Sequence, residues 1–113
     1  ENNNISMYDS DNLKKNIEKV IHEIDDVVEM FYQQKTKDAY IQLDSVLADL
    51  LQVIDPIHAY KVEHPDAGVD SESLTDALKE TLSAMEEKDA ILTADVLKYE
   101  VNEKLEMIMN VIQ

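Results

Sequence analysis

The chain has 113 residues and a formal net charge of −15, and it contains no cysteine. A surface this acidic repels phosphate groups, so the composition argues against nucleic acid and membranes as partners. The lack of cysteine excludes disulfides and thiolate chemistry and fits the cytoplasm. With one glycine and two prolines, the sequence has too few turn residues for a β-sheet protein. It therefore predicts a single all-α domain over residues 1–113.

Residues 10–33 are predicted to form the first helix, because large apolar residues recur there at steps of three and four. Asp9 or Ser10 is the expected N-cap, and residues 1–9 are expected to be a flexible tail. The predicted core face consists of Leu13, Ile17, Val20, Ile21, Ile24, Val27, Val28 and Phe31.

The second helix is expected to follow the polar stretch QQKTKD, with Thr36 as its cap. Pro56 interrupts its apolar run, and two interpretations are open: a kink at Pro56, or a fresh segment capped by Asp55. Ile57 keeps the phase of the preceding residues, which favours a kink or a tight restart. The predicted core face consists of Ala39, Leu43, Val46, Leu47, Leu50, Val53, Ile54 and Ile57.

The stretch EHPDAGVD at residues 63–70 holds the only glycine and the second proline, so it is predicted to be the loop between two helical hairpins. Ser71 or Ser73 is expected to cap the third helix, and the fourth is expected to begin near Asp89. The predicted core positions are Leu74, Leu78, Leu82 and Met85 of the third helix, and Ala94, Leu97, Val101, Leu105, Ile108 and Ile112 of the fourth. Because short turns make neighbouring helices antiparallel, the expected fold is an antiparallel four-helix bundle of two αα-hairpins.

The tripeptide Lys-Asp-Ala occurs at residues 37–39 and again at residues 88–90, 51 positions later. Each copy is expected in the first turn of the second helix of a hairpin. Two explanations are open: an internal duplication of the hairpin, or convergence, because acids and caps recur at helix starts for physical reasons.

Metal binding has one candidate motif, Asp55 and His58, with the acid–histidine spacing of carboxylate-bridged iron bundles. Such sites need two motifs and further inward-facing glutamates, so a surface role is favoured here. His64 beside Glu63 and Asp66, and His22 beside Glu18 and Asp26, are interpreted as ordinary surface groups. No catalytic, cofactor-binding or metal-binding residue is therefore predicted. The alternative is a small metal-dependent bundle enzyme using Asp55 and His58 with Glu100 and Glu103.

A second apolar stripe is predicted on the fourth helix, opposite its core face. Leu92, Val96 and Tyr99 recur there at i, i+4 and i+7, and Met107 lies near the same side. The stripe is either covered by the chain's own second helix or tail, or used to contact a protein partner. The hypothesis developed from it is a homodimer formed through Leu92, Val96 and Tyr99, because a two-fold axis lets a short ridge cover its own copy.

The segment AMEEKDAILTADVLKYEVNEKLEMI, residues 84–108, resembles a region of small, uncharacterised all-helical proteins of low-GC Gram-positive bacteria. The residues that carry this resemblance are Lys88-Asp89, Leu92, the run at 94–97, and Tyr99-Glu100. More distantly, the acidic bundle is similar to flagellar export chaperones, although no segment matches their client-binding helix. The resemblance implies a non-enzymatic, chaperone-like protein-interaction module without a cofactor.

Overall fold

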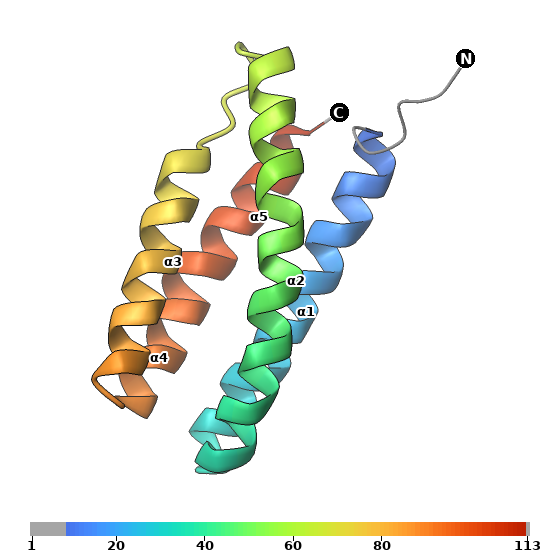
Figure 1. Cartoon of the computed structure of the whole chain (residues 1–113). Coiled ribbons are helices and arrows are strands. Elements are labelled where there is room, and N and C mark those ends of the chain that lie inside the picture. The colour runs from blue at the N-terminus through green and yellow to red at the C-terminus, as the bar shows by residue number, and fades with distance from the viewer. Residues whose placement is uncertain (1–8, 113) are drawn as a thin grey trace.

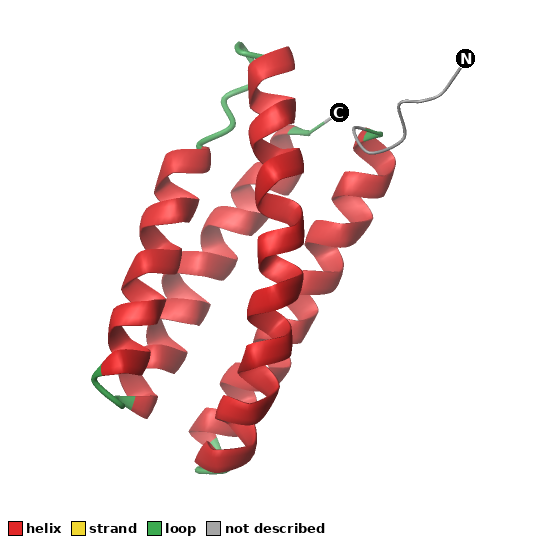
Figure 2. Cartoon of the chain, viewed as in Figure 1, coloured by secondary structure: helices red, strands yellow, loops and turns green. Residues whose placement is uncertain are grey.

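The computed structural model describes residues 9–112, in which the helices are joined by short turns and one loop and no strand occurs (Figures 1 and 2). The elements are α1 (Ser10–Tyr32), α2 (Thr36–Glu63), α3 (Ser71–Glu86), α4 (Ala90–Val96), a π-helical turn (Leu97–Val101) and α5 (Asn102–Val111). The last three follow each other without a break and together form one fourth helix, residues 90–111. The predicted all-α four-helix architecture is confirmed, and the tail predicted at residues 1–9 falls almost wholly outside the described residues. Nowhere in residues 9–112 is a helix long and apolar enough to cross a bilayer.

The four helices do not pack equally closely around the bundle. α1 packs along both α2 and the fourth helix, and α3 packs along the fourth helix. α2 and α3 are the remaining neighbours, and they approach each other least (Figure 1). The bundle is therefore closed on three sides and open along the side between α2 and α3.

The predicted core faces of α1 and the fourth helix are confirmed. Every apolar position expected to face the core in these two helices is buried. In α2 the prediction holds except at Leu47 and Ile54, which are only partly buried against the core, and Tyr60 joins the core in addition. Large aliphatic side chains at helical spacing were thus a sufficient signal in these helices.

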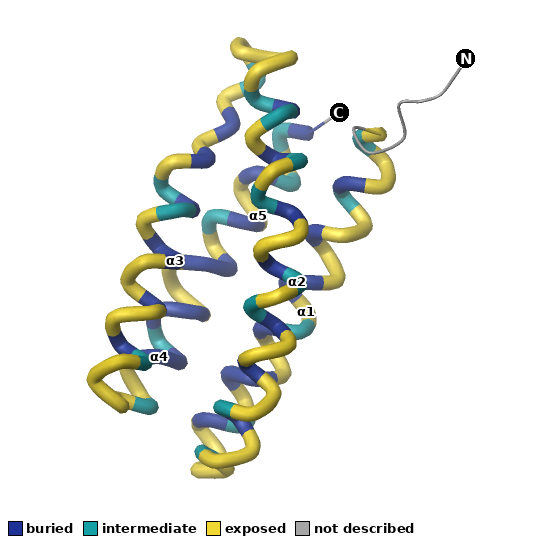
Figure 3. The backbone as a smooth tube through the Cα atoms, in the orientation of Figure 1, coloured by how far each residue is buried: buried dark blue, intermediate teal, exposed yellow. Residues whose placement is uncertain are grey.

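In α3 the predicted core was partly wrong. Leu82 is 46% exposed, and Met85 is only partly buried. Leu74 and Leu78 are buried as predicted, and the buried face of α3, which is turned toward the inside of the bundle (Figure 3), also holds Ala77, Thr81 and Ala84. Small side chains let two helix backbones approach closely, and the Thr81 hydroxyl donates to the Ala77 carbonyl at 2.9 Å, so it is buried with a partner.

The two short turns that close the hairpins have the same structure. Gln34 and Lys88 adopt positive φ values of 64° and 58°. The next residue donates its N–H to a carbonyl five residues earlier: Lys35 to Met30 at 2.9 Å, and Asp89 to Ala84 at 3.1 Å. This is the Schellman arrangement at a helix C-terminus.

This equivalence bears on the two explanations left open for the repeated Lys-Asp-Ala tripeptide. Structurally matching positions, such as Gln34 and Lys88, are 54 residues apart and not 51. The first Lys-Asp-Ala lies inside α2, whereas the second begins in the turn at Lys88 and ends at the first residue of α4. The tripeptides therefore do not occupy matching positions, which favours convergence at helix starts over a repeat in that register.

The helix ends differ in detail from those expected. Asp9 caps α1 by accepting from the N–H of Asp11, as predicted, but the N-cap of α2 is Lys35 and not Thr36. Asp70 replaces the predicted serines as the N-cap of α3, because its carboxylate accepts from both the backbone and the hydroxyl of Ser73. These bonds hold the pKa of Asp70 below its usual value.

α2 continues through Pro56 as one helix, so the fresh segment capped by Asp55 does not occur. The expected loop begins one residue later than predicted and runs over residues 64–70.

Candidate functional site

The structure assembles no metal centre among residues 9–112, where no three histidine or acidic side chains are placed to hold an ion. Asp55 and His58 are exposed on α2, and Glu100 and Glu103 are exposed on the fourth helix. α2 and the fourth helix lie diagonally across the bundle, so the pair Asp55 and His58 does not meet the pair Glu100 and Glu103.

The histidine of the loop has an ordinary structural partner. The His64 ring stacks on the Tyr60 ring, with centroids 4.1 Å apart, and its Nδ1 lies 3.2 Å from the Tyr60 carbonyl oxygen. This arrangement fixes the end of α2 and leaves His64 without the neighbours that an ion site requires.

The stripe predicted on the fourth helix is only partly exposed. Leu92, Tyr99 and Met107 are exposed, but Val96 is 8% exposed and counts as buried. Leu92 and Val96 border α3, where they line a depression of about 310 Å³ with Ala84 and Glu87. Val96 lies outside the core cluster, as expected, but it is not available as an exposed contact residue, because the edge of α3 reaches this side of the fourth helix.

Tyr99 belongs to a different cluster, which faces α1. The Lys98 ammonium lies 5.7 Å from the ring centre of Tyr32 and 5.1 Å from that of Tyr99. The Tyr32 hydroxyl donates to Asp95 at 2.6 Å, and mainly this bond raises the pKa of Tyr32 to about 12. Leu92 and Tyr99 thus border different helices, and the four predicted contact residues do not form one uninterrupted ridge.

The π-helical turn brings a buried polar residue into the bundle that the sequence analysis missed. Asn102 donates its backbone N–H to Leu97, five residues earlier, which is the π-helical bond. Its side-chain amide donates to the Ile21 carbonyl at 3.2 Å and to the Asp25 carboxylate at 2.8 Å. The extra residue in the turn places both Val101 and Asn102 inward, and Asn102 fixes the fourth helix against α1.

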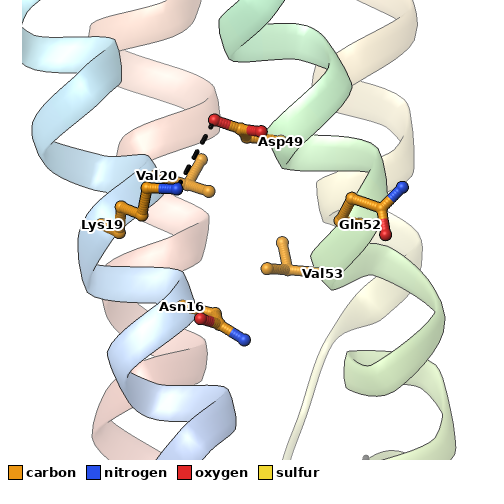
Figure 4. Close-up of a pocket in the computed structure, with 6 residues that line it drawn as sticks. All are labelled: Asn16, Lys19, Val20, Asp49, Gln52 and Val53. Atoms are coloured by element: carbon orange, nitrogen blue, oxygen red, sulfur yellow. Dashed lines mark ion pairs between the residues drawn. The ribbon is translucent and has the colours of Figure 1, made fainter.

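The interface between α1 and α2 carries a small polar depression (Figure 4). It measures about 180 Å³, and the Lys19 ammonium there lies 3.9 Å from the Asp49 carboxylate. The nearby Glu23 is partly buried, and this burial, followed by hydrogen bonding to Asp49 and then by the negative charge of Asp49, raises its pKa. The Lys19–Asp49 ion pair thus joins α1 to α2 across this interface.

The open side between α2 and α3 is the most distinctive surface of the described chain. At its loop end, His58 and Lys61 of α2 line a depression of about 370 Å³ together with Thr75 and Lys79 of α3. These residues therefore identify the flanks on which the two helices face each other. The opposite flank of α2 is equally well defined, because Asp49 lies against α1.

Apolar residues continue along both facing flanks. On α2, Leu47, Leu51 and Ile54 precede His58 at helical spacing, so they share its flank. On α3, Leu82 and Met85 follow Lys79 and line a shallow depression of about 570 Å³. We call these five residues the open edge.

The open edge consists of large apolar side chains that the bundle covers only in part. Leu51 is 57% exposed and Leu82 is 46% exposed, while Leu47, Ile54 and Met85 are partly buried against the core. Sequence analysis assigned four of the five to the core, since periodicity alone cannot reveal that the neighbouring helix stands away. The structure thus defines an all-α bundle with one apolar side left open.

The comparisons with known proteins identify a family but no activity. Residues 11–111 match the model of a family described as a domain of unknown function, DUF8042. The chain belongs to that family, since the match covers most of its length. Neither the search of curated proteins nor the search of solved structures found a match.

Proposed function

We propose that this chain is a non-enzymatic protein-interaction module that holds a partner segment, in the manner of a small chaperone. The observation that carries the proposal is the open edge, where Leu51 and Leu82 stay exposed beside three partly buried apolar residues. Exposed apolar surface of this kind is costly in water and is typical of binding sites.

A helical bundle missing coverage on one side is suited to helix-in-groove recognition. The floor is held rigidly, because Leu47 and Ile54 pack against the same core as the buried face of α2. A partner segment laid over Leu51 and Leu82 would therefore bury apolar area without requiring the bundle to refold.

The experiment that tests this proposal is site-specific photo-crosslinking in cells that make the protein naturally. A photoreactive residue is placed at Leu51 or Leu82 in the full chain, and a matched control carries it at Ile91. Ile91 is also aliphatic and is 53% exposed, but it lies at the start of α4, away from α2.

We expect discrete crosslinked products from Leu51 and Leu82 and none from Ile91. Equal products from all three positions would show non-specific contact and overturn the proposal. Two further variants carry the photoreactive residue at Tyr99 or Met107, and products from these two positions alone would move the contact surface to the fourth helix.

A further inference from the structure

The open edge is bordered mainly by carboxylates. Asp44 and Asp55 are exposed on α2, one or two turns from Leu51. On α3, Glu86 lines the same depression as Leu82, and Glu72 and Asp76 line the depression at the loop end. An apolar floor with an acidic rim selects for a ligand with the opposite pattern.

The rim also contains cations, but they are fewer. Lys61 and Lys79 are the lysines that line the depressions along this side. They stand against the five carboxylates on a chain whose formal net charge is −15. The field at the open edge is therefore negative, both locally and from the molecule as a whole.

From this pattern we infer that the open edge binds an amphipathic helix whose apolar face is flanked by lysine or arginine. The inference rests on the proposed function and specifies its partner. A second copy of this chain is disfavoured, because it would bring the same acidic rim and the same net charge against the first.

The dimensions of the edge suit a helix of a few turns. α3 has 16 residues, and a helix of that length spans about 24 Å. Apolar residues at i, i+3 or i+4, and i+7 of the ligand would lie over Leu51 and Leu82. Its flanking cations would then reach Asp55 on one side and Glu86 on the other.

The test uses the full chain and fluorescence anisotropy with four labelled synthetic peptides of about the length of α3. Three share one amphipathic apolar pattern and carry lysine, glutamine or glutamate on the flanks. The fourth has the lysine peptide's composition in scrambled order, which controls for the attraction of any cationic peptide to an acidic protein. We expect the lysine peptide to bind at least about tenfold more tightly than the glutamate peptide at low salt, with the ratio shrinking at about 0.5 M salt.

Two variants locate the binding. Leu51→Gln with Leu82→Gln should lower the affinity for the lysine peptide about tenfold or more, because the apolar anchors lose their floor. Ile91→Gln is the matched control and should leave binding unchanged. Asp55→Asn with Glu86→Gln should weaken the lysine peptide but not the glutamine peptide, and circular dichroism should show unchanged helix content in every variant.

The outcomes separate the inference from the proposed function. If all three amphipathic peptides bind equally and the Leu51/Leu82 variant loses them all, the open edge is a docking site but the basic partner is wrong. If the scrambled peptide binds as well as the ordered one, the amphipathic helix is wrong. If no peptide depends on Leu51 and Leu82, both the inference and the proposed binding at the open edge are overturned.

Discussion

The two hairpins close through the same turn but build their interiors differently. In the first hairpin, α1 and α2 meet through large aliphatic residues such as Ile17 and Leu50. In the second, the buried face of α3 combines Leu74 and Leu78 with the small residues Ala77, Thr81 and Ala84. Large apolar side chains make a buried interface easy to recognise in a sequence. Small side chains do not, because their effect is to let two helices pack closely, which is visible only in the structure. The difference explains why α3 is the helix whose buried face was misread.

The largest expected change in the free energy of unfolding distinguishes a leucine of the core from a leucine of the open edge. Leu50 is fully buried, so Leu50→Ala should lower the free energy of unfolding by about 2–5 kcal/mol. Leu82→Ala removes a half-exposed side chain and should cost less than about 1 kcal/mol. Chemical denaturation of both variants measures the difference, and equal costs would mean that α3 packs against α2 in solution.

The second effect should expose the tight packing of the second hairpin. Ala84 is 1% exposed, so Ala84→Leu forces a large side chain between α3 and the fourth helix and should cost about 1–3 kcal/mol. Ala48→Leu on the exposed face of α2 is the control and should be nearly neutral. A neutral Ala84→Leu in thermal unfolding would refute the small-residue interface.

A smaller effect should show that the two turns are equivalent. Gln34 and Lys88 are left-handed, which costs a non-glycine residue about 1–2 kcal/mol, while glycine loses about 0.5–1 kcal/mol more conformational entropy on folding. Gln34→Gly and Lys88→Gly should therefore each stabilise the chain by about 0.5–1 kcal/mol. Gln33→Gly, where φ is −82°, should destabilise it. A gain at one turn only would break the equivalence.

The smallest expected effect is a pH dependence of the free energy of unfolding, and it arises from Glu23 in the first hairpin. Partial burial, and then the hydrogen bond to Asp49 and the Asp49 charge, raise the pKa of Glu23 in the folded state above the ordinary 4.5. The folded chain then holds its proton more tightly than the unfolded chain does, so stability falls as the pH rises through this range. Glu23→Gln should thus be more stable than the parent chain at neutral pH and match it below the ordinary pKa.

The measurement is the free energy of unfolding across pH, with Glu106→Gln on the exposed side of α5 as the control. A difference between parent and Glu23→Gln that does not change with pH would show that Glu23 ionises normally.

The sequence by itself determined the fold class, the helices and most of the core. Steps of three and four in apolar residues place every core side chain of α1, because the geometry of a single helix fixes which residues share a face. Asp9 and the loop around Gly68 were equally readable, since caps and left-handed turns depend on local chemistry.

Only the tertiary structure decided which faces are covered, because coverage depends on the distance between helices. That distance leaves Leu82 of α3 46% exposed at the open edge, although its spacing matches that of the buried Leu74 and Leu78. The same packing buries Val96 beside α3 and, through the π-helical turn, carries Asn102 inward to α1. A periodic pattern reports direction around one helix axis, and it contains no information about how far away the neighbouring axis lies.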